Sequence, residues 1–215
     1  PRQGTGMAES YDFIIIGAGS AGAALAYRLS ESGKYTVLVL EAGGSDLNFW
    51  IQMPIGYGKA FYDKRINWKY MAEPDAGLNG RETYWPRGKV MGGSSSINAM
   101  VYVRGHPQDF DDWQEAGAKG WGWADVAPVF KRMETWSEGG DGLRGDTGPL
   151  WVQNIDKDVH PMCQTYLQAA REAQLETTED YNGAKFEGAA IYQITTHKGR
   201  RASTARCYLR PAMKR

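Results

Sequence analysis

The sequence predicts an α/β protein in which a Rossmann-like dinucleotide-binding domain is followed by the beginning of an α+β domain. Near the N-terminus an apolar run, a glycine-rich turn and a helical pattern follow one another directly, as in a βαβ unit. A second glycine cluster, at residues 92 and 93, marks another place where side chains are absent. With 215 residues, of which 42% are hydrophobic, the chain is long enough to bury a core of one or two domains.

Composition and charge exclude several classes of protein. The chain carries 25 basic and 25 acidic residues, so its zero net charge gives no electrostatic reason to expect nucleic acid or an anionic membrane as partner. It has no apolar run of about 18 residues and no basic leader, which predicts a cytoplasmic protein, with peripheral membrane association as the alternative. Cys163 and Cys207 lack metal-ligand spacing, so neither a metal site nor a disulfide framework is expected. Residues 1–6, "PRQGTG", precede Met7 and are interpreted as an expression scar.

Two apolar runs define the first βαβ unit. The run "YDFIIIG" (residues 11–17) has the β-branched composition of a buried parallel strand, and "YTVLVLE" (residues 35–41) predicts a second one. Between them, apolar residues recur at spacings of three and four, which predicts a helix with one apolar face. That face comprises Ala21, Ala24, Leu25 and Leu29, with Ala26 beside them.

The turn between the first strand and this helix has the pattern GxGxxG. Gly17 permits the tight turn, Gly19 lets a pyrophosphate approach the backbone, and Gly22 lets the helix pack on the strand. The helix N-terminus adds partial positive charge where the phosphates would lie. Glu41 ends the second strand, where its carboxylate can accept from ribose hydroxyls and would repel the 2′-phosphate of NADP. A purely structural glycine turn is the alternative interpretation.

A long segment at residues 42–85 separates this unit from the second glycine cluster. It is rich in aromatic and turn residues and has no clean helical or alternating period, which indicates a functional loop or a lid. Gly92 and Gly93 then remove side chains from the backbone. The residues that follow supply donors suited to a flat, polar-edged ring such as a flavin; they are Ser94, Ser95, Ser96 and Asn98. A glycine–serine linker is the alternative, but the apolar residues on both sides disfavour it.

These two glycine-rich stretches belong to a wider pattern. Together with "DFDDW", "GWGWADVAPVFKRME" and "GRRASTARCYLRPA", they closely resemble the N-terminal part of the glucose-methanol-choline (GMC) family of FAD-dependent oxidoreductases. The resemblance is greatest to bacterial choline-dehydrogenase-like and alcohol-dehydrogenase-like members. It runs from about Tyr11 to Arg210 and so covers nearly the whole chain.

The resemblance implies which residues hold FAD. One extended cofactor would contact both glycine clusters, with the pyrophosphate at the first and the flavin beside the second. In chain order the implied contacts are Gly17, Gly19, Ser20, Ala21 and Gly22 at the pyrophosphate, Glu41 and Ala42 at the ribose, Trp68 at the flavin edge, Arg87, Val90, Gly92, Gly93 and Ser94 along the middle, and Asn98, Ala99, Met100 and Val101 against the ring. Ile97 stands where some relatives carry a histidine bonded to the flavin, so the FAD is expected to be non-covalent.

The resemblance also implies the domain organisation and the activity. Residues 7–158 would form the FAD-binding domain, with the insertion at 42–85. Residues 159–215 would begin a substrate-binding domain, incomplete here, with a helix at 162–176 and a strand in "GAAIYQITT". The expected reaction is oxidation of a primary or secondary alcohol by hydride transfer to flavin N5. Oxygen or a quinone would accept the electrons. A histidine base and the other missing parts would lie in the C-terminal remainder of the polypeptide.

Two further functions remain open at this stage. One is a light-driven fatty-acid decarboxylase of the same family, and the other is a non-catalytic FAD-binding fragment. The three histidines, His106, His160 and His197, have no carboxylate or cysteine at ligand spacing and are expected to occupy surface or turn positions. Trp121 and Trp123 are expected to pack at the start of a helix. No catalytic residue is assigned within the chain.

Overall fold

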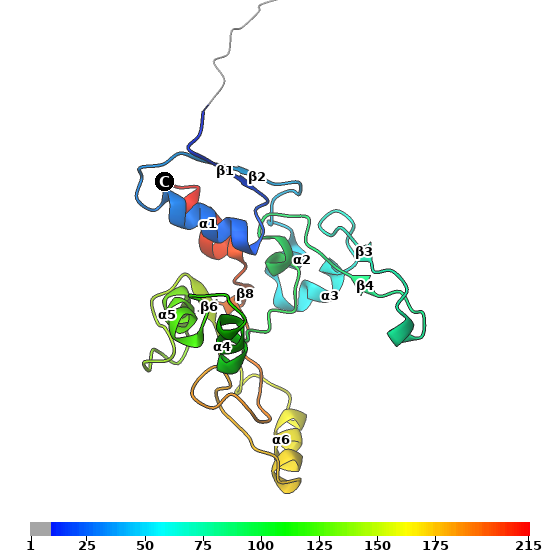
Figure 1. The fold of residues 1–215 in the computed structure, drawn as a ribbon. Coiled ribbons are helices and arrows are strands. Elements are labelled where there is room, and N and C mark those ends of the chain that lie inside the picture. Colours follow the sequence, from blue (N-terminus) through cyan, green and yellow to red (C-terminus); the bar gives the residue numbers. More distant parts are fainter. Residues whose placement is uncertain (1–9) are drawn as a thin grey trace, which may run out of the picture. The chain divides into compact units, whose positions relative to one another are not determined.

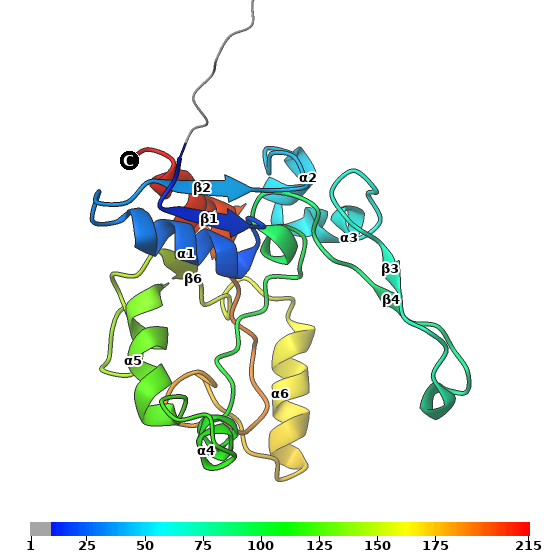
Figure 2. The same ribbon diagram turned by 45° about the horizontal axis from the view of Figure 1, so that its top comes forward.

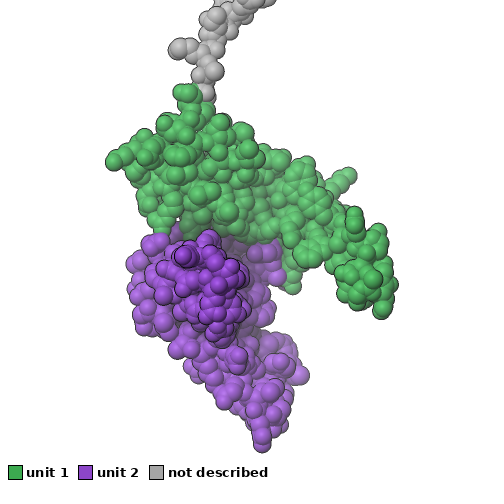
Figure 3. Space-filling view, in the orientation of Figure 1, with its two compact units in different colours: residues 1–51, 56–97, 204–215 green, residues 52–55, 98–203 purple. Residues whose placement is uncertain are grey.

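A computed structural model describes residues 10–215 (Figure 1). The expected expression scar at residues 1–6 lies outside the described residues. The chain divides into two compact units, shown in Figure 3: unit 1 takes residues up to 51, 56–97 and 204–215, and unit 2 takes 52–55 and 98–203. These units are defined by packing, so the predicted domain boundary after residue 158 stays a prediction.

The predicted βαβ arrangement forms the start of unit 1. Strand β1 (Phe13–Ile16) leads into helix α1 (Ser20–Ser30), and strand β2 (Val37–Leu40) pairs with β1 in parallel, with Phe13 opposite Val37 and Ile16 opposite Leu40 (Figure 2). The α/β class and the strand–turn–helix order predicted from the sequence are therefore confirmed.

The buried face of α1 differs from the predicted one. Ala23 and Ala26 are buried, whereas Leu25 is half exposed and Ala21 is exposed. Small side chains occupy the buried face because the backbone of α1 lies very close to β1. A Cβ atom on Gly22 would lie 3.2 Å from the Ile15 side chain and only 1.9 Å from the Gly17 carbonyl oxygen. The close contact between helix and strand therefore determines which face of α1 is buried. The positions of the larger apolar residues do not.

The sheet of β1 and β2 exposes apolar side chains. Among the described residues it contains these two strands only, with Ile14 60% and Ile16 87% exposed. Exposure of these β-branched side chains to water is unfavourable, and burying them would lower the free energy. Within the described residues, one face of this two-stranded sheet therefore leaves apolar side chains in contact with solvent.

The predicted long insertion folds into short elements with one apolar cluster. Its elements are α2 (Phe49–Gln52), η1 (Pro54–Gly56), α3 (Tyr57–Ala60), β3 (Tyr70–Met71), η2 (Ala76–Leu78) and β4 (Tyr84–Trp85). Strands β3 and β4 form an antiparallel pair. The cluster that supports them consists of Ile51, Ala60, Ile66, Val90 and Ile97. Because no element exceeds four residues, the sequence shows no sustained period.

The last residues of the chain return to α1. The π-helix η4 (Ala205–Leu209) and the short helix α7 (Arg210–Ala212) pack on α1, where the rings of Tyr208 and Tyr27 meet edge to face at 5.5 Å. The Arg215 guanidinium lies 4.3 Å from the centre of the Tyr27 ring. Arg210 also forms an ion pair with the buried Asp46. These contacts fix the C-terminal segment within unit 1.

Unit 2 combines three helices with short strand pairs. Its elements are α4 (Pro107–Glu115), α5 (Trp123–Met133), β5 (Glu134–Trp136), β6 (Leu150–Val152), α6 (Met162–Glu172), β7 (Thr196–His197) and β8 (Arg200–Arg201). The helix expected at 162–176 is present as α6. The strand expected in "GAAIYQITT" is reduced to bridges, because Ile194 pairs with both Val101 and Gln153 in place of one continuous partner strand.

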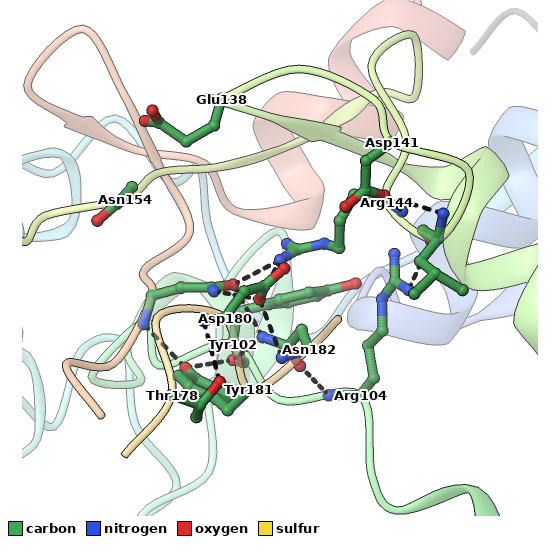
Figure 4. A network of polar contacts seen from close by, with 12 residues as sticks. Tyr102, Arg104, Glu138, Asp141, Arg144, Asn154, Thr178, Asp180, Tyr181 and Asn182 are labelled. Carbon is green, nitrogen blue, oxygen red and sulfur yellow. Dashed lines mark hydrogen bonds and ion pairs between the residues drawn. The ribbon is translucent and has the colours of Figure 1, made fainter. Parts of the chain in front are cut away.

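A buried ion network occupies the centre of unit 2 (Figure 4). Glu134, at the start of β5, accepts from the Arg144 Nε at 2.8 Å, from the Gly145 amide at 3.0 Å and from Arg104. Arg144 Nη1 donates to Asp180 at 2.7 Å. Burial would lower the pKa of Arg144, but its bonds to Glu134 and Asp180 outweigh burial and raise it. Two buried guanidinium groups are thus neutralised by the buried Glu134 and the partly exposed Asp180.

The network predicts a large stability difference between two glutamates. In Glu134→Gln, two buried guanidinium groups lose their shared carboxylate, and breaking a buried ion pair costs about 3–5 kcal/mol of unfolding free energy. In the control Glu138→Gln the side chain is exposed, and the expected change is within about 0.5 kcal/mol. Urea unfolding of both variants measures this. Equal stability of the two variants would contradict the role of Glu134.

Candidate functional site

The turn between β1 and α1 has the geometry of a phosphate-binding turn. Gly17 adopts the left-handed region at φ +94°, which L side chains rarely occupy. Gly22 is held against the Gly17 carbonyl, as described above. A Cβ atom on Gly19 would meet nothing nearer than Gly93 Cα at 4.0 Å, so the backbone there is open to an approaching group. The three glycines thus fit the separate roles that the sequence assigns to them.

Helix α1 begins without a capping side chain. Gly19 occupies the N-cap, no side chain bonds the first amides, and the first turn contains no acidic residue. Ser20 and Ala21 are exposed there. The amides and the partial positive charge of this 11-residue helix are therefore available to an anion such as a pyrophosphate.

Glu41 connects the two loops at the ends of β1 and β2. Its Oε2 accepts from the Ala18 amide at 2.7 Å, and its Oε1 accepts from the Gly43 amide at 2.8 Å. The sequence predicts a bond from Glu41 to a ribose, and the structure shows bonds to the backbone. Each carboxylate oxygen has a second lone pair, so the two roles are compatible.

A cavity lies beside Glu41 within unit 1. Its volume is about 310 Å³, and its lining comprises Ala18, Val37, Val39, Glu41, Met91, Leu209 and Met213. The lining is mostly apolar with one carboxylate, which suits a flat aromatic group attached to a hydroxylated sugar. Ala42, the other residue expected at the ribose, is exposed next to Glu41.

The two glycine clusters of the sequence touch each other. The Gly92 amide donates to the Ala18 carbonyl at 2.7 Å, and a Cβ atom on Gly93 would lie 2.8 Å from Gly19 Cα. We call this backbone approach of Gly19 and Gly93 the glycine contact. The sequence suggested that side chains were removed for a ligand. In the structure a Cβ atom on Gly93 would also meet the Gly19 backbone, and one on Gly92 would meet Ser96 and Ala205.

The serines that follow close their own turn. Ser94 Oγ accepts from the Gly88 amide at 3.2 Å, and Ser96 Oγ donates to the Met91 carbonyl at 2.7 Å. Ser95 Oγ donates to the Gly92 carbonyl at 2.7 Å and accepts from the Thr204 amide at 3.0 Å. The sequence predicts these hydroxyls as donors to a ligand; in the structure they hold the 3-10 turn η3 (Gly93–Ser96).

Three other predicted contact residues have different environments. Val90 is fully buried in the apolar cluster, so only its backbone is available to a ligand. Trp68 is 43% exposed, stacks on Tyr70 at 6.0 Å and has the Lys89 ammonium 4.5 Å from its ring centre. Arg87 is exposed, with its guanidinium 5.0 Å from the centre of the Trp85 ring. Trp68 and Arg87 therefore belong to an exposed cationic and aromatic surface.

The residues predicted against the flavin ring, Asn98 to Val101, belong to unit 2. Asn98 and Ala99 are exposed, whereas Met100 is buried and adopts φ +66°. The Asn98 Oδ1 accepts from the Met100 amide at 3.1 Å, which stabilises this strained turn. Ile97 just before it is buried in the apolar cluster of unit 1.

Sequence reasoning missed two residues of the site. Ala18 bonds both Glu41 and Gly92, but only through its backbone, so its side-chain type carries no signal. Thr204 bonds Ser95 although 109 positions separate them. Such a long-range pair has no local pattern in a single sequence.

The family model for GMC oxidoreductases matches residues 11–215. The chain belongs to the GMC oxidoreductase family. The resemblance found in the sequence is thereby confirmed.

Curated relatives are identical to this chain at more than half of the aligned positions. An oxygen-dependent choline dehydrogenase of Rhizobium johnstonii is 56% identical over 204 residues, which are 95% of this chain and 37% of the relative. One from Rhizobium meliloti is 54% identical over the same coverage. The chain therefore spans little more than a third of these relatives' length.

Solved structures of the family have the same fold. Pyridoxine 4-oxidase from Mesorbium loti superposes with a TM-score of 0.88 at 36% identity, over 93% of this chain and 39% of that one. An FAD-dependent oxidoreductase from Chaetomium thermophilum superposes with a TM-score of 0.82 at 32% identity. The match covers 95% of this chain and 37% of that one. The Rossmann-like fold class is confirmed, and family membership together with such relatives confirms FAD as the expected cofactor.

Glu41→Ala is predicted to weaken FAD binding. The substitution removes an ionised acceptor that orders the β1–α1 turn, and a hydrogen bond to a charged group is worth about 1.5–3 kcal/mol. The dissociation constant of FAD should therefore rise about ten- to a hundredfold in a fluorescence titration of protein stripped of flavin. Glu31→Ala, which removes an exposed carboxylate at the C-terminal end of α1, is the control. Equal affinities would contradict the role of Glu41.

Proposed function

We propose that this protein is an FAD-dependent oxidoreductase that oxidises a primary or secondary alcohol. The observation that carries the proposal is the open GxGxxG turn beside the Glu41 cavity, in a chain of the GMC family. When bound, FAD supplies an acceptor for the hydride that leaves the alcohol carbon. Choline is the first substrate to test, because the relatives with more than half of their residues identical are choline dehydrogenases.

The chain's own residues divide the work of holding the cofactor. We assign the pyrophosphate to the start of α1 and the adenosine end to the cavity beside Glu41. The middle of the cofactor would pass along the backbone of Gly92 and Gly93, with Asn98 to Val101 against the flavin. The accessible backbone at Gly19 and the exposed Asn98 support this assignment.

The proton acceptor for the alcohol is proposed to lie in the rest of the polypeptide. All three histidines of this chain have structural partners: His106 and His160 accept from the backbone amides of Gln108 and Met162, and the His197 ring lies 3.7 Å from that of Trp151. The exposed Ile14 and Ile16 on β1 support burial by further polypeptide. We propose oxygen or a quinone as the electron acceptor, on the basis of the sequence resemblance. A cytoplasmic location is likewise proposed from the sequence. Within residues 10–215, no helix has the length and apolarity to cross a bilayer.

The test uses the full-length protein. Acid treatment should release FAD intact into the supernatant, because Ile97 offers no nucleophile for a covalent bond; a denatured protein that stays yellow would contradict this.

Under anaerobic conditions choline should bleach the flavin absorption band, and ethyltrimethylammonium, which lacks the hydroxyl group, should not. Panels of other primary and secondary alcohols extend the assay. If no alcohol bleaches the flavin, the proposal fails, and hydrocarbon release from fatty acids under blue light would indicate the decarboxylase instead.

A further inference from the structure

The turn at Asn98 is held by a buried arginine from a distant strand. Arg201, on β8, is only 1% exposed, and its Nη1 donates to the Asn98 carbonyl at 2.7 Å and to Asn98 Oδ1 at 2.9 Å. One guanidinium nitrogen thus bonds both the backbone and the side chain of Asn98. Both residues belong to unit 2.

These bonds determine how the Asn98 amide is oriented. Its Oδ1 accepts from two donors, the Met100 amide at 3.1 Å and Arg201 Nη1. An amide nitrogen cannot accept either bond, so the alternative flipped orientation is excluded. The Nδ2 group therefore lies on the opposite side from Arg201, and within the described residues it donates no hydrogen bond. Asn98 itself is exposed, so its NH₂ group is offered as a donor.

The surrounding backbone fixes where Arg201 lies. In the β7–β8 pair, Arg201 is opposite Thr196. The Ala202 amide donates to the Thr195 carbonyl at 2.9 Å, and the Thr195 amide donates to the Met100 carbonyl at 2.9 Å. The backbone next to Arg201 is therefore linked through Thr195 to Met100, which belongs to the same turn as Asn98. Arg201 has little freedom to adopt another position.

A guanidinium in the interior is costly unless it has a specific task. Burial lowers the pKa of Arg201 to about 10, so it still carries its charge at neutral pH. A lysine in its place would keep the charge but would carry it on a flexible four-carbon stem, which fixes the position of the donor less well than the planar guanidinium does. A neutral, apolar residue would remove the desolvation cost altogether. Two hydrogen bonds of this buried guanidinium go to Asn98.

We propose that Arg201 is a positioning residue that orients the Asn98 amide so that Nδ2 donates to the flavin. This inference rests on the proposed function, in which Asn98 lies against the flavin ring. Arg201 acts through Asn98 and has no direct contact with the cofactor in this proposal. The effect that Arg201 has on the flavin through this amide should therefore disappear when the Asn98 side chain is removed.

A double-mutant cycle on the full-length, FAD-loaded protein tests this dependence. The variants are Arg201→Lys, Asn98→Ala and both together. The readouts are the dissociation constant of FAD and the positions of its visible absorption bands. Arg200→Lys is the matched control, because Arg200 is the exposed neighbour on the same strand. Circular dichroism and the thermal midpoint establish that each variant is folded.

We expect Asn98→Ala and Arg201→Lys each to raise the FAD dissociation constant about three- to tenfold, the effect of one lost hydrogen bond, and to shift the absorption bands. The double variant should match Asn98→Ala, and Arg200→Lys should match the unmodified protein. Additive effects, or an unchanged flavin in Arg201→Lys while Asn98→Ala alters it, would overturn the role of Arg201. An unchanged flavin in Asn98→Ala would instead refute the assignment of Asn98 in the proposed function.

If Arg201→Lys does not fold, Arg201→Gln replaces it in the same cycle, because glutamine retains an amide donor of shorter reach. Loss of the fold in both variants would contradict the proposal. It would show that Arg201 is needed for the folding of unit 2 and has no separable role at Asn98.

Discussion

The glycine contact is the constraint on which the rest of unit 1 depends. Gly19 opens α1 and Gly93 opens η3, and their backbones approach so closely that a Cβ atom on Gly93 would lie 2.8 Å from Gly19 Cα. This approach lets the Gly92 amide reach the Ala18 carbonyl, while Glu41 holds the Ala18 amide. The phosphate turn and the second glycine cluster are therefore one backbone assembly.

Unit 2 is organised by side-chain charge. Glu134 and Asp180 neutralise the buried Arg104 and Arg144, and the neighbouring Asn182 and Gln193 add further hydrogen bonds. A buried carboxylate between two guanidinium groups restricts the loops that contribute them to one arrangement. The same unit presents the Asn98 turn, so this charged interior supports the part of the chain assigned to the flavin.

The sequence predicted what depends on local pattern and missed what depends on distant partners. The βαβ unit was predictable, because β-branched runs and the GxGxxG turn are contiguous. The buried face of α1 was not, because Gly22 brings the helix so close to β1 that Ala23 and Ala26 are preferred to Leu25. Likewise, the serines of η3 bond the backbone of their own turn, and Ser95 also bonds Thr204. No spacing in the sequence reveals so distant a partner.

FAD retention in Gly93→Ala, compared with Gly80→Ala, tests the glycine contact most directly. Both glycines have left-handed φ angles, +54° and +71°, so both variants incur a similar backbone cost of about 1–2 kcal/mol. Only Gly93 lies against another backbone, since a Cβ atom on Gly80 has nothing within 4 Å. Gly93→Ala should lose FAD during dialysis, and Gly80→Ala should retain it. Full FAD occupancy in Gly93→Ala, or equal loss in both variants, would contradict the central role of the glycine contact.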